Sequence, residues 1–293
     1  MGVVQRVRRG VAGNSSWLWP ALVLAFLSAG CAATPLRKAV VPYGTATESA
    51  AAALAAEPAR ARATCQRRLD LDRLQRLLDG RDGTGRAALV EECDEIAAIG
   101  AIHLRSLQLL EAYGRSLVAI AGRSSTGETA GLPSARGELG EALAGVLLTG
   151  WTERTLEEAI GEAQQPALRL LHALRSWGKA VAMQLQDYRA LLREVDESLL
   201  ARHERRLDPV EAITVAAHFA ALEREADDWQ TSLERFDAVI GALIAAQEGL
   251  GQAAGSGSDG GAASLGEVTT RVDEVRAWLR SLAPAAEEVR LAR

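Results

Sequence analysis

The sequence predicts an all-α protein, an elongated antiparallel helical bundle that contains a long, coiled-coil-like helical hairpin. Three observations lead to this prediction. Ala, Leu, Glu and Arg dominate and aromatic residues make up only 4%, and such side chains lose little rotamer freedom in a helix. Clusters of β-branched residues bounded by turn residues, which mark strands, are nearly absent. Two long stretches in the second half carry apolar residues at alternating spacings of three and four.

The first thirty residues carry a targeting pattern. Arg6, Arg8 and Arg9 stand without any acidic residue before an apolar run over 17–29, and small residues then precede a cysteine in Leu27-Ser-Ala-Gly-Cys31. This order resembles the signal peptide and lipobox of bacterial lipoproteins. The resemblance implies a signal peptide over 1–30, cleavage before Cys31 and acyl chains, such as palmitate, on that cysteine.

Residue 32 is Ala rather than Asp, which in the lipoprotein sorting pattern implies the outer membrane, facing the periplasm. Two alternatives remain at this stage. An uncleaved transmembrane anchor would need about 20 apolar residues, which is more than the run over 17–29 offers. A plain secretory signal would leave Cys31 without lipid.

The region after Cys31 is expected to be a tether over 31–44, because it contains Pro35 and Pro42. The helical bundle is then predicted over 45–249. Thr45-Ala-Thr-Glu48 fits a capping box, so the first helix is expected from about 46 to 79. A Gly-rich turn over 80–85 separates it from a second helix over about 86–121.

Cys65 and Cys93 fall on these two helices. If the helices form an antiparallel hairpin, the two cysteines lie near the same level, and outside the cytoplasm such a pair tends to be oxidised. We therefore predict a disulfide. The alternative is two buried free thiols.

The middle of the chain, over 122–165, is rich in glycine and predicts weak helices. A loop is expected over 122–134, and two short, weak helices are expected over 135–165, because each interior glycine costs about 1 kcal/mol relative to Ala. Pro166 predicts a break and a restart.

The hairpin is the strongest pattern. Apolar residues recur from Leu171 to Leu199 and again from Val215 to Leu243, on either side of Asp208-Pro209. A short turn makes the two helices antiparallel. Pairing about residues 208 and 209 places Tyr188 opposite Trp229, and Gly178 opposite Ile240.

After the hairpin, Gly, Ser and Ala dominate 250–263, which predicts a flexible linker. Residues 264–293 are predicted to be a C-terminal helix and tail. Ser264-Leu-Gly-Glu267 opens the helix with a second capping box, and Pro284 is expected to end it.

Candidate binding residues lie on the first helix. Arg60, Arg62, Arg67 and Arg68 could form a patch that contacts anionic lipid. The alternative is that such arginines pair with acidic residues three or four positions away, as with Asp70 and Asp72. Among the tryptophans, Trp229 is expected in the core, and Trp177 is expected there too unless it marks a binding groove.

The composition and motifs also exclude function classes. The formal net charge is −5, and removal of 1–30 with its three arginines leaves −8, so general binding of nucleic acid is not expected. No two histidines share a helix face at i, i+4, and no Walker A loop or nucleophile elbow is present. We therefore predict no catalytic residues, no metal site and no cofactor, and an enzyme is the least favoured class.

Two functions remain. The first is a membrane-anchored envelope lipoprotein that acts as a non-enzymatic adaptor, spacer or assembly factor with an envelope protein partner. The second is a helical binding module for a lipid, glycan or small apolar ligand. The sequence leaves the oligomeric state open.

Overall fold

The computed structural model of the protein describes residues 35–80, 86–122, 156–203 and 208–291, which belong to one compact unit. These residues form helices without a strand among them, so the all-α prediction is confirmed. The helices are α2 (Pro35–Leu54), α3 (Glu57–Asp79), α4 (Arg86–Gly122), α6 (Leu156–His203), α7 (Pro209–Gly255) and α8 (Gly257–Leu291). Residues 1–34 lie outside the described part, so the signal peptide and Cys31 remain predictions.

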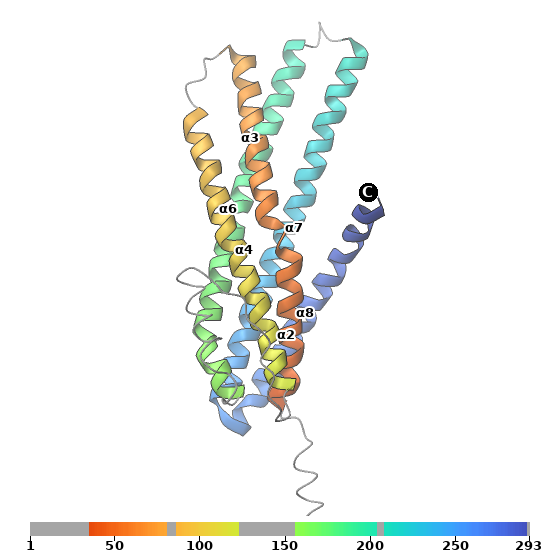
Figure 1. Cartoon of the computed structure of the whole chain (residues 1–293). Coiled ribbons are helices and arrows are strands. Elements are labelled where there is room, and N and C mark those ends of the chain that lie inside the picture. The colour runs from red at the N-terminus through yellow and green to blue at the C-terminus, as the bar shows by residue number, and fades with distance from the viewer. Residues whose placement is uncertain (1–34, 81–85, 123–155, 204–207, 292–293) are drawn as a thin grey trace, which may run out of the picture. The chain divides into compact units, whose positions relative to one another are not determined.

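The helices run alternately up and down (Figure 1). α2 and α3 follow each other in one direction and α4 returns along both, whereas α6 and α7 form a hairpin and α8 turns back along α7 and α2. We call the end where α2 begins and α7 meets α8 the base. We call the opposite end, where α3, α4, α6 and α7 reach Asp79, Arg86, His203 and Pro209, the tip.

The predicted tether is wrong from residue 35 onward, because α2 begins at Pro35 and includes Pro42. Leu36, Val40 and Tyr43 are buried against the other helices. Proline is tolerated in the first turn, where the N–H would be unpaired anyway. At Pro42 the burial of the surrounding apolar side chains outweighs the loss of one helical hydrogen bond.

The predicted single helix over 46–79 is two helices. α2 ends at Leu54 and α3 starts at Glu57, with Pro58 in its first turn. Proline in a helix interior clashes with the carbonyl four residues earlier, and for Pro58 that residue is Leu54. The break therefore follows from a proline whose effect the capping analysis missed.

The second helix and the disulfide are confirmed. α4 starts at Arg86 as predicted, and its apolar stripe, including Ile96, Leu107 and Leu117, is buried. Cys65 and Cys93 are bonded, with their Cα atoms 5.6 Å apart. Because the bond joins α3 to α4, it ties together the half of the bundle nearer the tip.

The predicted break at Pro166 is wrong, since α6 runs from Leu156 to His203 without interruption. Ile160, Ala163, Ala167 and Leu170 are buried on both sides of the proline. This continuous apolar stripe holds both turns against the core, so tertiary packing overrides the local preference of proline. The predicted loop over 122–134 and most of the predicted weak helices over 135–165 lie outside the described residues.

The antiparallel hairpin is confirmed, and most of the two predicted seams is buried. Tyr188 and Trp229, which were predicted to face each other, line the same cleft. At Gly178, however, the partner on α7 lies about one turn nearer the tip than predicted. A Cβ added at Gly178 would lie 2.8 Å from the ring of Phe236, so Phe236 rather than Ile240 covers this glycine. The reason is that α6 ends at His203, so the centre of the turn falls before Asp208 rather than after it.

The predicted linker over 250–263 is also wrong. α7 continues to Gly255, and α8 starts at Gly257. A Cβ at Gly249 would lie 2.9 Å from a methyl group of Val268, so small residues here allow α7 and α8 to approach closely. The described helix α8 also continues past Pro284 to Leu291, contrary to the predicted end. None of the described helices contains a stretch that is long and apolar enough to cross a bilayer.

A buried polar cluster lies near the base. The hydroxyls of Tyr43 and Tyr113 donate to the same side-chain oxygen of Gln247, at 2.7 and 3.0 Å. Next to it, α2 and α4 touch backbone to backbone, because a Cβ at Gly44 would lie 2.6 Å from the carbonyl oxygen of Gly114. Small residues and a shared hydrogen-bond acceptor therefore hold α2, α4 and α7 together at the base.

Candidate functional site

A cleft lies between α3 and α7, with α6 as its floor. Its volume is about 270 Å³. α3 packs on α4 and α6 rather than on α7, and the small side chains of Ala63 and Ala226 line the space between α3 and α7. Leu185 and Tyr188 form the floor from α6, and Trp229 lies at one side.

At the end nearer the base, Arg60 and Trp229 line the cleft, and both contact Glu57, a buried residue that is only 3% exposed. It accepts hydrogen bonds from the indole N–H of Trp229 at 2.9 Å and from the hydroxyl of Ser232 at 2.8 Å. The guanidinium of Arg60 lies 3.2 Å from the same carboxylate. A buried carboxylate with this many partners is a firm link between the start of α3 and the middle of α7.

The end nearer the tip is closed by one ion pair. Arg67 of α3 lies 2.6 Å from Glu225 of α7, and their side chains are 42% and 57% exposed. The hydrogen bond from Arg67 to Glu225 raises the pKa of the arginine, which stays charged. Because exposed pairs contribute only about 0–1 kcal/mol, this link opens at little cost.

The hydroxyl of Tyr188 lies at the floor of the cleft. The residue is 2% exposed, and its oxygen is buried close to the guanidinium of Arg67. Burial raises the pKa of Tyr188, whereas the charge of Arg67 and a hydrogen bond with it lower the pKa in part. The hydroxyl stays protonated at neutral pH, so its hydrogen is available to a molecule bound in the cleft.

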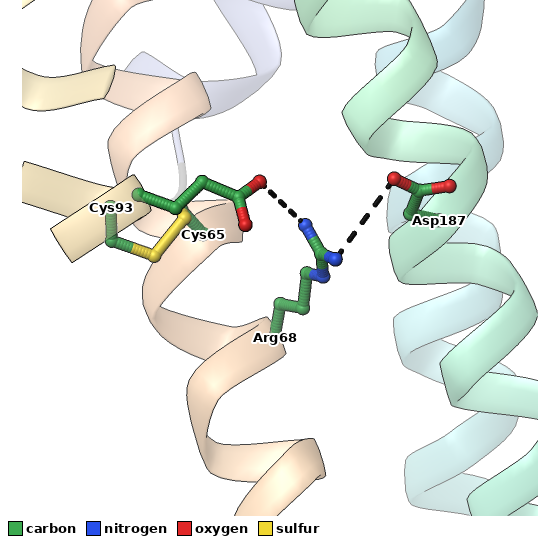
Figure 2. Close-up of a disulfide and its surroundings, with 5 residues drawn as sticks. Cys65, Arg68, Cys93 and Asp187 are labelled. Carbon is green, nitrogen blue, oxygen red and sulfur yellow. Dashed lines mark hydrogen bonds and ion pairs between the residues drawn. A yellow bond between two sulfur atoms is a disulfide. The ribbon is translucent and has the colours of Figure 1, made fainter. Parts of the chain in front are cut away.

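The four predicted lipid-contact arginines fall into two groups. Arg60, Arg67 and Arg68 are held by acidic side chains of this chain, whereas Arg62 is exposed. Figure 2 shows Arg68 beside the disulfide, reaching from α3 to Glu92 of α4 at 2.9 Å and toward Asp187 of α6 at 4.0 Å. Arg67 and Arg68 thus pair with acidic residues of other helices. The alternative of pairing within the helix is borne out at Asp72, which lies 2.9 Å from Arg76 of the same arginine-rich helix. The lipid-contact patch remains a prediction.

The two tryptophans that the sequence predicts in the core are buried. Trp177 and Trp229 are each 6% exposed. Trp177 lies between His103, with ring centres 5.1 Å apart, and Phe236, at 5.6 Å. Burial lowers the pKa of His103, whose Nδ1 is buried without a partner among the described residues. Trp177 therefore belongs to the core rather than to a binding groove.

A second candidate surface is the tip. Several of the large apolar side chains that are exposed in the described residues lie within a few turns of this end: Leu77, Leu200, Val210 and Ile213. Val210 and Ile213 stand on the outer side of α7, three residues apart, each 69% exposed. Large apolar side chains grouped at an exposed end are a feature of interaction sites.

No group of three or more His, Cys, Asp or Glu side chains in the described residues could hold a metal ion. The chain matches no protein-family model, no curated protein and no solved structure.

Sequence reasoning missed two residues that shape the cleft. Glu57 looks like an ordinary acidic residue before a proline, and its burial follows from the break between α2 and α3. Tyr188 was assigned to the hairpin seam, where its ring lies, but its hydroxyl extends beyond the seam toward α3. A tyrosine in a heptad seam signals such a polar end, because its hydroxyl cannot be satisfied by apolar neighbours.

Proposed function

We propose that the chain is a membrane-anchored lipoprotein of the bacterial cell envelope that acts as a non-enzymatic helical adaptor, spacer or assembly factor. The resemblance of residues 1–31 to a lipoprotein signal supports the anchor on Cys31. Cys31 stands four residues before Pro35 in the chain, so an anchor there would hold the base of the bundle.

The observation that carries the adaptor role is the exposed apolar group at the tip. α7 has 47 residues, which at 1.5 Å per residue span about 70 Å. A base held at a membrane would thus present Val210 and Ile213 to partners tens of ångströms away. A spacer with an apolar far end is the arrangement that an assembly factor needs.

The anchor is tested by the intact mass of the protein extracted from bacterial membranes. We expect cleavage before Cys31, added acyl chains and two hydrogens missing because of the disulfide. Cys31→Ser should lose the acyl mass and leave the membrane fraction. A wild-type protein without acyl mass would refute the anchor.

The adaptor role is tested by placing a photo-crosslinking amino acid at Ile213 in the native host. A discrete protein adduct is expected. Met183 is a matched control position, since it is equally exposed at 68% but lies on α6 away from the tip. Absence of an adduct at Ile213, or the same adduct at Met183, would contradict docking at the tip.

The cleft favours a second function, a helical binding module. Its volume and the Tyr188 hydroxyl and Arg67 guanidinium that line it are features that a spacer does not require. Native mass spectrometry of protein purified from its own membranes tests this function, because a bound ligand appears as an additional non-covalent mass.

A further inference from the structure

The chemistry of the cleft between α3 and α7 narrows the class of ligand, on the basis of the second proposed function. Its walls carry opposite charges. Arg60 and Arg67 line it from α3, whereas Glu225 and Asp228 line it from α7. A ligand with a single charge would meet one favourable wall and one unfavourable wall, and a zwitterion would match both.

The lining of the cleft combines polar and apolar surface. Leu185, Leu222 and Ala226 contribute aliphatic groups, and Trp229 contributes an aromatic ring whose N–H is already used by Glu57. At about 270 Å³ the space is just below the range of 300–1,000 Å³ typical of drug-sized ligands. A small molecule therefore fits better than a glycan chain.

The Tyr188 hydroxyl supplies a further polar contact. It is buried at the floor of the cleft beside Arg67, whose charge and hydrogen bond lower the pKa of the tyrosine in part. An anionic group bound here would receive hydrogen bonds from both Arg67 and Tyr188. It would also replace Glu225 as the partner of the arginine.

The two ends of the cleft differ in how readily they open. The Glu57 end is buried and multiply hydrogen-bonded, whereas the Arg67–Glu225 pair is half exposed. Opening this pair frees a guanidinium on one wall and a carboxylate on the other. The entrance therefore offers one binding group for each charge of a zwitterion.

We propose that this cleft binds a small zwitterion, its anion held by Arg67 and Tyr188 and its ammonium by Glu225 and Asp228. The same chemistry occurs in a free α-amino acid with an apolar side chain and in a phosphoethanolamine lipid head group. The two sources differ in their anion, which is a carboxylate in the first and a phosphate in the second.

Calorimetric titration of the full-length protein in non-ionic detergent tests the proposal with four probes. Leucine and glycerophosphoethanolamine carry both charges, whereas isoamylamine and 4-methylpentanoate carry one each. We expect one of the two zwitterions to bind, and both single-charge probes to bind at least tenfold more weakly. Tighter binding of leucine would identify the amino acid source, and tighter binding of glycerophosphoethanolamine the head group.

Variants locate the binding. Tyr188→Phe keeps the floor and removes the hydroxyl, and should weaken binding about fivefold to tenfold. Ala63→Met fills the cleft and should abolish binding, whereas Ala59→Met, on an exposed position of α3 that does not line the cleft, should leave it unchanged. Equal binding of the single-charge and the zwitterionic probes, or binding that survives Ala63→Met, would overturn the proposal.

Failure of this inference and failure of the binding-module function are distinguishable. If none of the probes binds but the native protein carries another mass, the zwitterion is wrong and the module stands. If no probe binds and the native mass is bare, both are wrong.

Discussion

At the base of the bundle α2 and α4 meet backbone to backbone, whereas nearer the tip α3 and α7 are joined across a cleft by long polar side chains. The base is built from Gly44, Gly114 and a buried Tyr43–Gln247 hydrogen bond. The other half depends on the Cys65–Cys93 bond and on pairs such as Arg67–Glu225. Close backbone packing fixes how the helices at the base lie against each other. Nearer the tip, the disulfide holds α3 to α4, and a cleft remains between α3 and α7.

The largest effect is expected from the disulfide. Cys65→Ala with Cys93→Ala should lower the free energy of unfolding by about 3–4 kcal/mol, because the bond closes a loop between residues 28 positions apart. Hydrogen exchange should show that backbone amides in α3 and the first half of α4 lose protection first. If amides at the base lost protection to the same extent, the inferred difference between the two halves would be wrong.

The base should respond to a single methyl group. Gly44→Ala places a Cβ against the Gly114 carbonyl and should destabilise the protein by ~1–3 kcal/mol in chemical denaturation. Gly161→Ala is the matched control in α6, since no described atom lies within 4 Å of its Cβ position. The control should be stabilised by ~0.5–1 kcal/mol. A stabilised Gly44→Ala variant would show that the close approach is absent.

Acidification should weaken the core around Trp177. The pKa of His103 is lowered by burial, so the unfolded chain binds a proton more readily than the folded one. Stability is therefore retained above the ordinary histidine pKa of about 6.5 and falls as the pH drops below it. Denaturant unfolding at pH 7.5 and 5.0 should show a smaller loss for His103→Gln than for the exposed-site control His172→Gln.

The smallest effect on stability is expected at the tip. Ile213→Ser should change the free energy of unfolding by less than ~0.5 kcal/mol, because this side chain is 69% exposed. Phe219→Ala, six residues further along α7 and 6% exposed, should cost ~3–5 kcal/mol. A large loss at Ile213 would mean that the tip is covered in solution, and that its apolar side chains serve folding or self-association.

Sequence periodicity predicted much of the fold because long amphipathic helices carry their burial pattern in their spacing. The seam from Leu171 to Val195 and the level of Cys65 and Cys93 are examples. Of the candidate site, the sequence supplied Arg60 and Arg67 as a cluster, with lipid or the nearby acids Asp70 and Asp72 as predicted counterparts, whereas the structure pairs them with Glu57 and Glu225. Glu57 stands three residues before Arg60 on α3, a spacing that favours pairing, but its burial depends on α7. Glu225 lies on a different helix from Arg67, and spacing along one helix carries no information about it.

The sequence by itself determined the helical class, the hairpin and the pairing of the cysteines, since these depend on local propensity and on short-range register. Tertiary structure decided whether proline and glycine interrupt the chain. Pro42, Pro166 and the Gly/Ala stretch after residue 249 lie inside helices because neighbouring helices bury the adjacent side chains or require small ones. Local penalties of a few kcal/mol at such residues are offset by apolar burial that only the packed bundle provides.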